Sequence, residues 1–165
     1  MLYRADLPAN PAIRRILVIK WSAMGDVIIA TALFEDIARA FPEREIHLDT
    51  LPPWKSLFEQ DPRFQRIFAV DLRDRRQRGR RTMEWLRQIR GQHYDLVIDL
   101  QCNDRSRLLI ALLWLSGHRI PYRLGNSPRF PYNIAPAKLP KPVPAITLGR
   151  ASLQAGGIRA ITPRP

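Results

Sequence analysis

Short apolar runs alternate with longer amphipathic segments along most of the chain. The β-branched, apolar runs at residues 15–20 and 94–100 are typical of strands buried on both faces of a sheet. Two more strands are predicted at residues 45–51, where apolar and polar residues alternate, and at residues 65–72. The alternation in the first of these indicates a strand nearer the edge of the sheet.

Apolar residues between these runs recur every three to four positions, which is the spacing of one helix face. The stripes that predict the first two helices are Val27, Ala30, Phe34, Ala38 and Phe41, then Met83, Leu86 and Ile89. A third, strongly apolar helix is predicted at residues 105–116, closed by Gly117. Because strands alternate with helices, we predict an α/β fold with an open, mostly parallel, doubly wound sheet.

The last third of the chain has a different character. Residues 119–125 predict a short fifth strand, and the many prolines of residues 127–144 predict an irregular loop before a last helix at residues 145–155. A length of 165 residues fits one domain. We therefore expect residues 1–150 to form one domain and residues 151–165 to begin a linker.

Charge and cysteine content indicate the class of partner and the cellular compartment. Lysine and arginine number 27 against 15 acidic residues, and the formal charge of +12 indicates an anionic partner: nucleic acid, anionic lipid or a phosphorylated sugar. The single cysteine, Cys102, excludes an internal disulfide and fits a reducing compartment. No signal peptide or membrane-spanning run is recognisable, so a cytoplasmic location is expected, with peripheral contact at an anionic inner membrane as an option.

The loops that follow the predicted strands are the first place to look for chemistry, because open parallel sheets bind ligands beyond the carboxyl ends of their strands. The four distinctive loops are residues 21–26, 52–55, 73–81 and 101–106. In the first, Asp26 stands at the predicted start of a helix after Gly25, where an unusual dihedral or a close backbone approach would favour glycine. Taken alone, this pattern indicates only a helix N-cap.

Two segments together resemble the heptosyltransferases, glycosyltransferase family nine. They are ILVIKWSAMGD at residues 16–26, followed by an apolar helix, and YDLVIDLQCNDRS at residues 94–106. They occur in the order expected for the family and span most of residues 15–125. Cys102 departs from the family pattern, which usually has glycine after Gln101.

The resemblance implies one half of a GT-B enzyme, in which two Rossmann-like domains face a cleft. Such enzymes transfer heptose, with inversion, from a nucleotide sugar such as ADP-heptose to the lipopolysaccharide core, without a metal or other cofactor. This chain would supply the N-terminal, acceptor-side domain, and the donor-binding C-terminal domain is missing from it. The residues that match family positions are Asp26 as catalytic base and Ser22, Gly25, Gln101, Arg105 and Ser106 as substrate-binding residues.

Other functions compete with this interpretation. A nicotinamide- or flavin-binding domain is disfavoured because the first loop lacks G-x-G-x-x-G. The scattered histidines His47, His93 and His118 do not suggest a metal site. A non-catalytic module that binds an anionic membrane or nucleic acid remains open, although nucleic acid is disfavoured because the basic residues do not alternate with exposed aromatics. The arginine cluster of residues 73–81 is either a solvated loop or a contact for phosphate or membrane.

Overall fold

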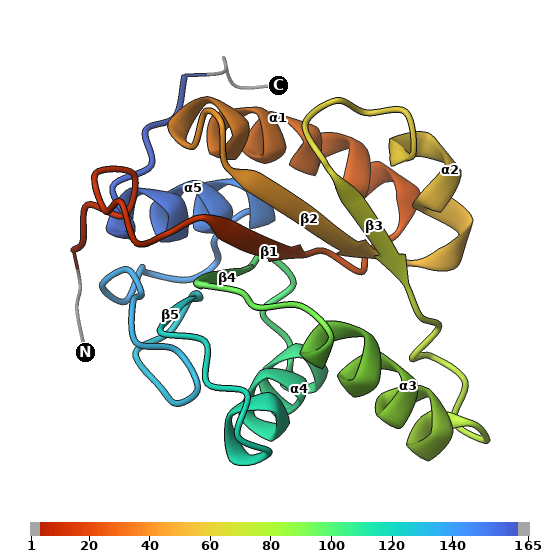
Figure 1. Cartoon of the computed structure of the whole chain (residues 1–165). Coiled ribbons are helices and arrows are strands. Elements are labelled where there is room, and N and C mark those ends of the chain that lie inside the picture. Colours follow the sequence, from red (N-terminus) through yellow and green to blue (C-terminus); the bar gives the residue numbers. More distant parts are fainter. Residues whose placement is uncertain (1–3, 162–165) are drawn as a thin grey trace.

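Five parallel strands form the centre of the domain. A computed structural model describes residues 4–161 and places the strands in the order β3-β2-β1-β4-β5, with every neighbouring pair parallel (Figure 1). The strands are β1 (Arg15–Ile19), β2 (Glu45–Thr50), β3 (Arg66–Ala69), β4 (Leu96–Asp99) and β5 (Tyr122–Leu124). The predicted α/β fold with an open parallel sheet is confirmed.

Helices cover both faces of this sheet. They are α1 (Met24–Ala40), the 3₁₀ turn η1 (Pro52–Trp54), α2 (Lys55–Phe58), α3 (Arg78–Arg90), α4 (Asp104–Leu115) and α5 (Ala145–Ala155). The helices α1 and α5 lie on one face, and α3 and α4 lie on the other (Figure 1). The sheet is therefore doubly wound, as the order of strands and helices predicts.

The position of β1 at the centre of the sheet explains why its residues 16–19 are all apolar. Ile16 and Val18 belong to the core between the sheet and α1, whereas Leu17 and Ile19 belong to the core on the α3 and α4 side. Because successive side chains of a strand point to opposite faces, both sets must be apolar when both faces are covered.

Strand β2 carries two polar side chains that are buried. It lies one strand from the edge of the sheet, with β3 outside it. His47 and Asp49 are 1% and 0% exposed, because the alternate positions of β2 face the α3 side of the core. Hydrogen bonds compensate this burial: His47 Nδ1 lies 2.7 Å from the Tyr94 hydroxyl, and Asp49 accepts two indole N–H groups.

The buried face of α3 differs from the predicted stripe. Trp85 and Ile89 are fully buried, whereas Met83, which we assigned to the apolar face, is 60% exposed. The buried face is therefore rotated from the predicted one, because the large indole of Trp85 fills the space against the sheet. Its neighbour on that face is Trp21, whose ring lies edge-on at 6.5 Å.

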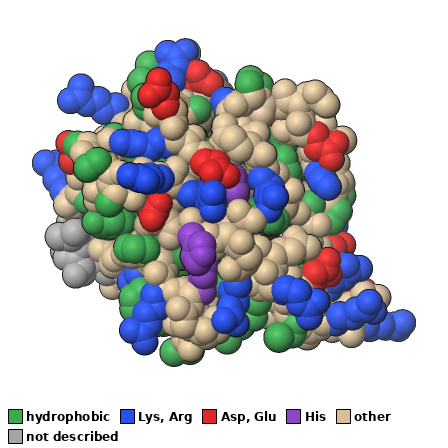
Figure 2. All heavy atoms as spheres, viewed as in Figure 1, with side chains coloured by type: hydrophobic (Ala, Val, Ile, Leu, Met, Phe, Trp, Pro, Cys, Tyr) green, Lys and Arg blue, Asp and Glu red, His purple; other side chains and the backbone are tan. Residues whose placement is uncertain are grey.

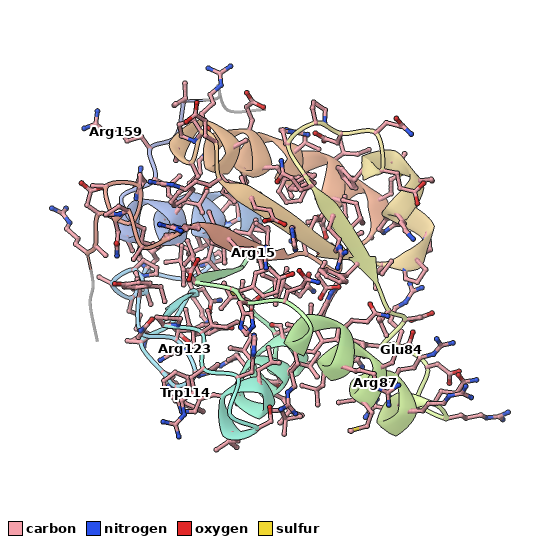
Figure 3. All side chains as sticks on the ribbon, in the orientation of Figure 1. Arg15, Glu84, Arg87, Trp114, Arg123 and Arg159 are labelled. Atoms are coloured by element: carbon pink, nitrogen blue, oxygen red, sulfur yellow. The ribbon has the colours of Figure 1, made fainter. Side chains whose placement is uncertain are left out.

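The segment after α4 is irregular but well anchored. Residues 127–144 contain no helix, and a single bridge joins Ile134 to Leu124. Arg123, on β5, donates to the Ile120 carbonyl at 2.7 Å and also to the Pro131 carbonyl, while its guanidinium lies 4.1 Å from the ring centre of Trp114 (Figure 3). This buried arginine thus connects β5 both to α4 and to the loop of residues 127–144.

The last helix extends the packed domain beyond the predicted boundary at residue 150. Helix α5 runs to Ala155, and Leu153 and Ile158 are buried against the core that includes α1. Residues 162–165 of the predicted linker lie outside the described part of the chain. Within residues 4–161, no helix has the length and apolar character needed to cross a bilayer.

Candidate functional site

Parallel pairing brings the four distinctive loops to one edge of the sheet. The loops of residues 21–26, 52–55, 73–81 and 101–106 follow β1, β2, β3 and β4, which all run in the same direction. The expectation that all four lie on the carboxyl edge is therefore confirmed. In sheets of this kind, that edge is where ligands bind.

Asp26 lies in the first turn of α1 and not at its cap. The N-cap residue is Ala23, which has no side chain able to cap the helix. Asp26 is exposed, and it lines a cavity of about 200 Å³ between the carboxyl edge and α5. Apolar residues, among them Leu33 and Ile146, form much of the remaining wall. The carboxylate is therefore accessible to a ligand that enters this cavity.

Gly25, immediately before Asp26, is not required by the packing of the domain. A Cβ atom placed there meets nothing within 4 Å, and the residue does not have a positive φ. The expected unusual dihedral is therefore absent. The bare backbone at this position faces open space beside Asp26, where a ligand can approach closely.

Lys20 is a cation at the same cavity that the sequence alone did not single out. It follows β1 directly and lines both the Asp26 cavity and an adjoining cavity of about 190 Å³. Its Nζ lies 3.5 Å from the Leu100 carbonyl oxygen. Burial lowers the pKa of the Lys20 ammonium, and the Asp26 carboxylate is the strongest of the charges that oppose this shift. A polar residue directly after a fully apolar strand was the available signal.

The loop between β1 and Asp26 is fixed by two neighbouring loops. The Gln101 side-chain oxygen accepts hydrogen bonds from the Trp21 backbone N–H and from the Ser22 hydroxyl, both at 2.9 Å. From the loop after β2, the Trp54 indole donates to the Ser22 carbonyl oxygen at 2.9 Å. Gln101 and Ser22 are therefore bonded to each other, and the loop carrying Asp26 is preorganised.

The turn after β4 is organised by the buried carboxyl group of Asp99. One carboxyl oxygen accepts the backbone N–H groups of Gln101 and Cys102, at 2.9 and 2.8 Å, and the other accepts the Tyr132 hydroxyl at 2.5 Å. Burial raises the pKa of Asp99, while these hydrogen bonds oppose the increase. Burial also raises the pKa of the Cys102 thiol, so it stays protonated and is a poor nucleophile.

Ser106 is placed where a ligand cannot reach it. It is fully buried, and it forms a reciprocal capping box with Asn103 at the start of α4: the Ser106 N–H donates to Asn103 Oδ1 at 2.8 Å, and the Asn103 N–H donates to the Ser106 hydroxyl at 3.1 Å. The predicted substrate contact is therefore replaced by a structural role in starting the helix.

Arg105 faces a different cavity from Asp26. It lines a groove of about 240 Å³ between α3 and α4, together with Arg78, Thr82 and Leu108. Of the arginine cluster, only Arg78 lines this groove. The remaining members belong to the loop before α3 and to its first turn, and Figure 2 shows Lys and Arg side chains gathered at the corner of the molecule where α3 lies. The structure thus divides the predicted site into the Asp26 cavity on the α1 side, which Lys20 also lines, and the groove of Arg78 and Arg105 on the α3 side, which Asp104 also lines. They are named the acidic cavity and the basic groove after Asp26 and the two arginines.

The conformation of Cys102 gives a test of the turn. Its φ of 48° lies in the left-handed region, which costs a non-glycine residue about 1 kcal/mol. We expect Cys102→Gly to have a free energy of unfolding about 1 kcal/mol higher than Cys102→Ala, because both variants lose the thiol and only alanine keeps the strain. Urea denaturation of the two variants measures the difference, and equal midpoints would contradict the strained conformation.

No metal-binding group is present among residues 4–161, where no three histidine, cysteine, aspartate or glutamate side chains gather. His93 and His118 lie side by side, with ring centres 6.2 Å apart, but no third ligand joins them in this part of the chain. The charged groups that line the two cavities are the carboxylates of Asp26 and Asp104, the ammonium of Lys20 and the guanidinium groups of Arg78 and Arg105.

Three solved structures that are similar to this chain are glycosyltransferases. A glycosyl transferase of family 9 from Veillonella parvula is 24% identical, with a TM-score of 0.72 over 88% of this chain and 42% of its own. Escherichia coli heptosyltransferase WaaC, bound to ADP-2-deoxy-2-fluoro heptose, is 20% identical, with a TM-score of 0.69 over 88% of this chain and 49% of its own. The E. coli ADP-heptose lps heptosyltransferase II is 22% identical, with a TM-score of 0.59 over 92% and 44%.

Sequence comparison adds nothing to this result: no family model and no curated protein matches the chain. The chain spans less than half of each of these three solved structures. Its five-stranded parallel sheet, flanked by helices, therefore has the fold of a single Rossmann-like half of the family 9 heptosyltransferases.

Proposed function

We propose that this chain is the acceptor-side half of an inverting, heptosyltransferase-like glycosyltransferase of family nine. The observation that carries the proposal is the position of Asp26, exposed at a cavity on the carboxyl edge, in a fold shared with heptosyltransferases. One of those structures contains an ADP-linked heptose analogue, which supports a nucleotide-activated heptose as the donor. The lipopolysaccharide core is the corresponding acceptor.

In the proposed reaction, Asp26 accepts the proton of an acceptor hydroxyl while the hydroxyl oxygen attacks the anomeric carbon of the donor sugar. The new glycosidic bond forms as the bond to the nucleotide diphosphate breaks, and the configuration inverts. A carboxylate base within hydrogen-bond reach of the hydroxyl is what this step requires. The hydrogen bonds that Gln101 accepts from Trp21 and Ser22, and the one that Trp54 donates to Ser22, support the proposal, because a fixed loop keeps the carboxylate in place.

The test is a transfer assay on the full gene product with ADP-heptose and a phosphorylated lipopolysaccharide core as the acceptor. Release of ADP together with the mass of one heptose added to the acceptor is the expected result. Absence of transfer from every nucleotide sugar tried would contradict the proposal.

The basic groove gives a separate prediction about the acceptor. We expect Arg105→Ala to raise the acceptor KM about 10-fold, because a charge-assisted hydrogen bond to phosphate or carboxylate contributes roughly 1.5–3 kcal/mol. The donor KM should stay unchanged. Arg87→Ala is the matched control, since it removes the same charge from an exposed position on α3 that lines neither cavity (Figure 3). If Arg105→Ala raised only the donor KM, this chain would be the donor side of the enzyme and not the acceptor side.

A binding module for an anionic surface is the second candidate. The observation in its favour is the net charge of +12 together with the exposed arginines over α3 (Figure 2). In that case binding to anionic vesicles or oligonucleotides should fall steeply with salt, and Asp26→Ala should leave it unchanged.

A further inference from the structure

Asp49 forms an unusual buried contact on the opposite face of the sheet from the Asp26 cavity. A single carboxyl oxygen of Asp49 accepts two indole N–H groups, from Trp21 at 3.0 Å and from Trp85 at 2.6 Å. The side chain is 0% exposed, and its second oxygen is buried without a hydrogen-bond partner among residues 4–161. Such an arrangement destabilises the fold, because an unsatisfied buried oxygen keeps its full desolvation penalty, and it therefore calls for an explanation.

The two indoles belong to the two parts of the candidate site. Trp21 begins the loop that leads to Asp26, and Trp85 belongs to α3, which contributes Arg78 to the basic groove. A backbone hydrogen bond from the Lys20 N–H to the Asp49 carbonyl, at 2.9 Å, adds a third tie at the same point. Asp49 therefore connects the Asp26 loop to α3 through hydrogen bonds to both indoles.

We propose that Asp49 is a positioning residue: its carboxylate holds both indoles and thereby couples the Asp26 loop to α3, so that the acidic cavity and the basic groove keep a fixed relation. Charge-assisted hydrogen bonds are stronger than those to a neutral acceptor. The coupling is therefore tight when Asp49 is ionised and looser when it is protonated.

The groups around Asp49 place this change close to neutral pH. Burial raises the pKa of Asp49 to about 7, the two indole hydrogen bonds oppose the increase, and the charge of Asp99 on β4 adds to it. Apolar neighbours face it from the adjoining strands, Ile19 on β1 and Phe68 on β3. Tyr94, whose own pKa the Asp49 charge raises, contacts His47, and the charges of Arg15, Glu45 and Arg66 act on both of these groups.

The sign of the stability effect follows from this shift. Between the ordinary aspartate pKa of 3.8 and the raised value of about 7, the folded chain binds more protons at Asp49 than the unfolded chain does. The contribution of Asp49 to the free energy of unfolding is therefore present at acidic pH and is lost as the pH rises to about 7. The local coupling and the global stability consequently change in opposite directions.

The experiment is a pH titration of the ¹⁵N-labelled chain, followed through its four tryptophan indole resonances. We expect the Trp21 and Trp85 resonances to move together with one midpoint at a pH of about 7, and the backbone amides of residues 22–26 to follow the same midpoint. Trp114 is the internal control, because its indole lies against Arg123 and not at Asp49. Trp54 is not a control, since its indole donates to Ser22 within the Asp26 loop. Trp21→Phe and Trp85→Phe assign the two resonances.

Asp49→Asn is the decisive variant, because its amide oxygen can still accept the indoles but cannot titrate. It should abolish the common midpoint and leave the indole resonances constant across the pH range. Indoles that titrate with different midpoints, loop amides that do not follow, or a midpoint that persists in Asp49→Asn would each overturn the proposal. This readout needs no substrate, so it fails independently of the proposed transferase.

The consequence for activity rests on the proposed function. In the full gene product, the transfer rate should have a pH-dependent limb with the same midpoint, and Asp49→Asn should remove that limb. If the pH dependence of the transfer rate persisted in Asp49→Asn, the ionisation of Asp49 would not control that rate.

Discussion

Replacing Asp26 with asparagine should lower the kcat of sugar transfer about 10²–10⁴-fold, which is the range that a positioned general base contributes. The acceptor KM should change little, because the amide fills the same space and the lost interaction belongs to the transition state. The free energy of unfolding should change by no more than about 1 kcal/mol, since Asp26 is exposed and only its charge near the helix N-terminus is lost. Initial rates of ADP release at varied acceptor concentration measure kcat and the acceptor KM, and a melting curve measures the change in stability.

The matched control is Asp6→Asn, which removes the same charge from an exposed residue ahead of β1, at the opposite end of the sheet. It should retain the full transfer rate. If Asp26→Asn also retained it, Asp26 would not be the base, and the acidic cavity would serve binding alone.

Replacing Gly125 with alanine should destabilise the fold by about 3 kcal/mol. A Cβ atom at this position would lie 2.4 Å from the Tyr132 ring, which is buried and cannot move freely. Overpacking of this kind costs about 1–3 kcal/mol, and displacing Tyr132 would also take its hydroxyl from the buried carboxyl group of Asp99. For a chain of this length, the melting temperature should fall by about 10 °C.

Gly79→Ala provides the comparison, because a Cβ atom there meets nothing within 4 Å and the position lies in the first turn of α3. Its melting temperature should equal or slightly exceed that of the parent, since alanine favours the helix. Equal stability of the two variants would mean that Tyr132 does not pack on Gly125 as described.

The sheet could be predicted from the sequence because each central strand contains an apolar run, residues 16–19 in β1 and residues 96–98 in β4. Residues 15–20 and 94–100 contain β1 and β4, and both are buried on both faces. The parallel direction of the strands, though not their order, follows from the alternation of strands and helices, and it places the loop before Asp26 on the carboxyl edge. These features depend on local composition, which a single sequence displays.

The parts that could not be predicted depend on contacts between distant segments. Met83 was assigned to the buried face of α3 because it lies three residues from Leu86, but the indole of Trp85 fills that space. Asp49 was one polar position in an alternating strand, and only the fold shows that two distant indoles bond to it.

The candidate site was also predicted only in part, because it too depends on contacts between distant segments. Ser106 matched a polar position of the family motif, but its hydroxyl is used inside the turn. Lys20 lies within the motif, and its polar character directly after β1 does not by itself reveal that it shares a cavity with Asp26. The separation of Arg105 from that cavity also depends on how α4 packs against α3.

Binding of an acceptor to this chain alone tests the acceptor-side assignment most directly. A ¹⁵N-labelled sample is titrated with a phosphorylated lipopolysaccharide core and, separately, with ADP-heptose. We predict that the acceptor shifts the resonances of residues around Asp26 and Arg105, while ADP-heptose alone shifts none of them. Binding of ADP-heptose to the Asp26 cavity, or acceptor binding that leaves both residues unaffected, would contradict that assignment.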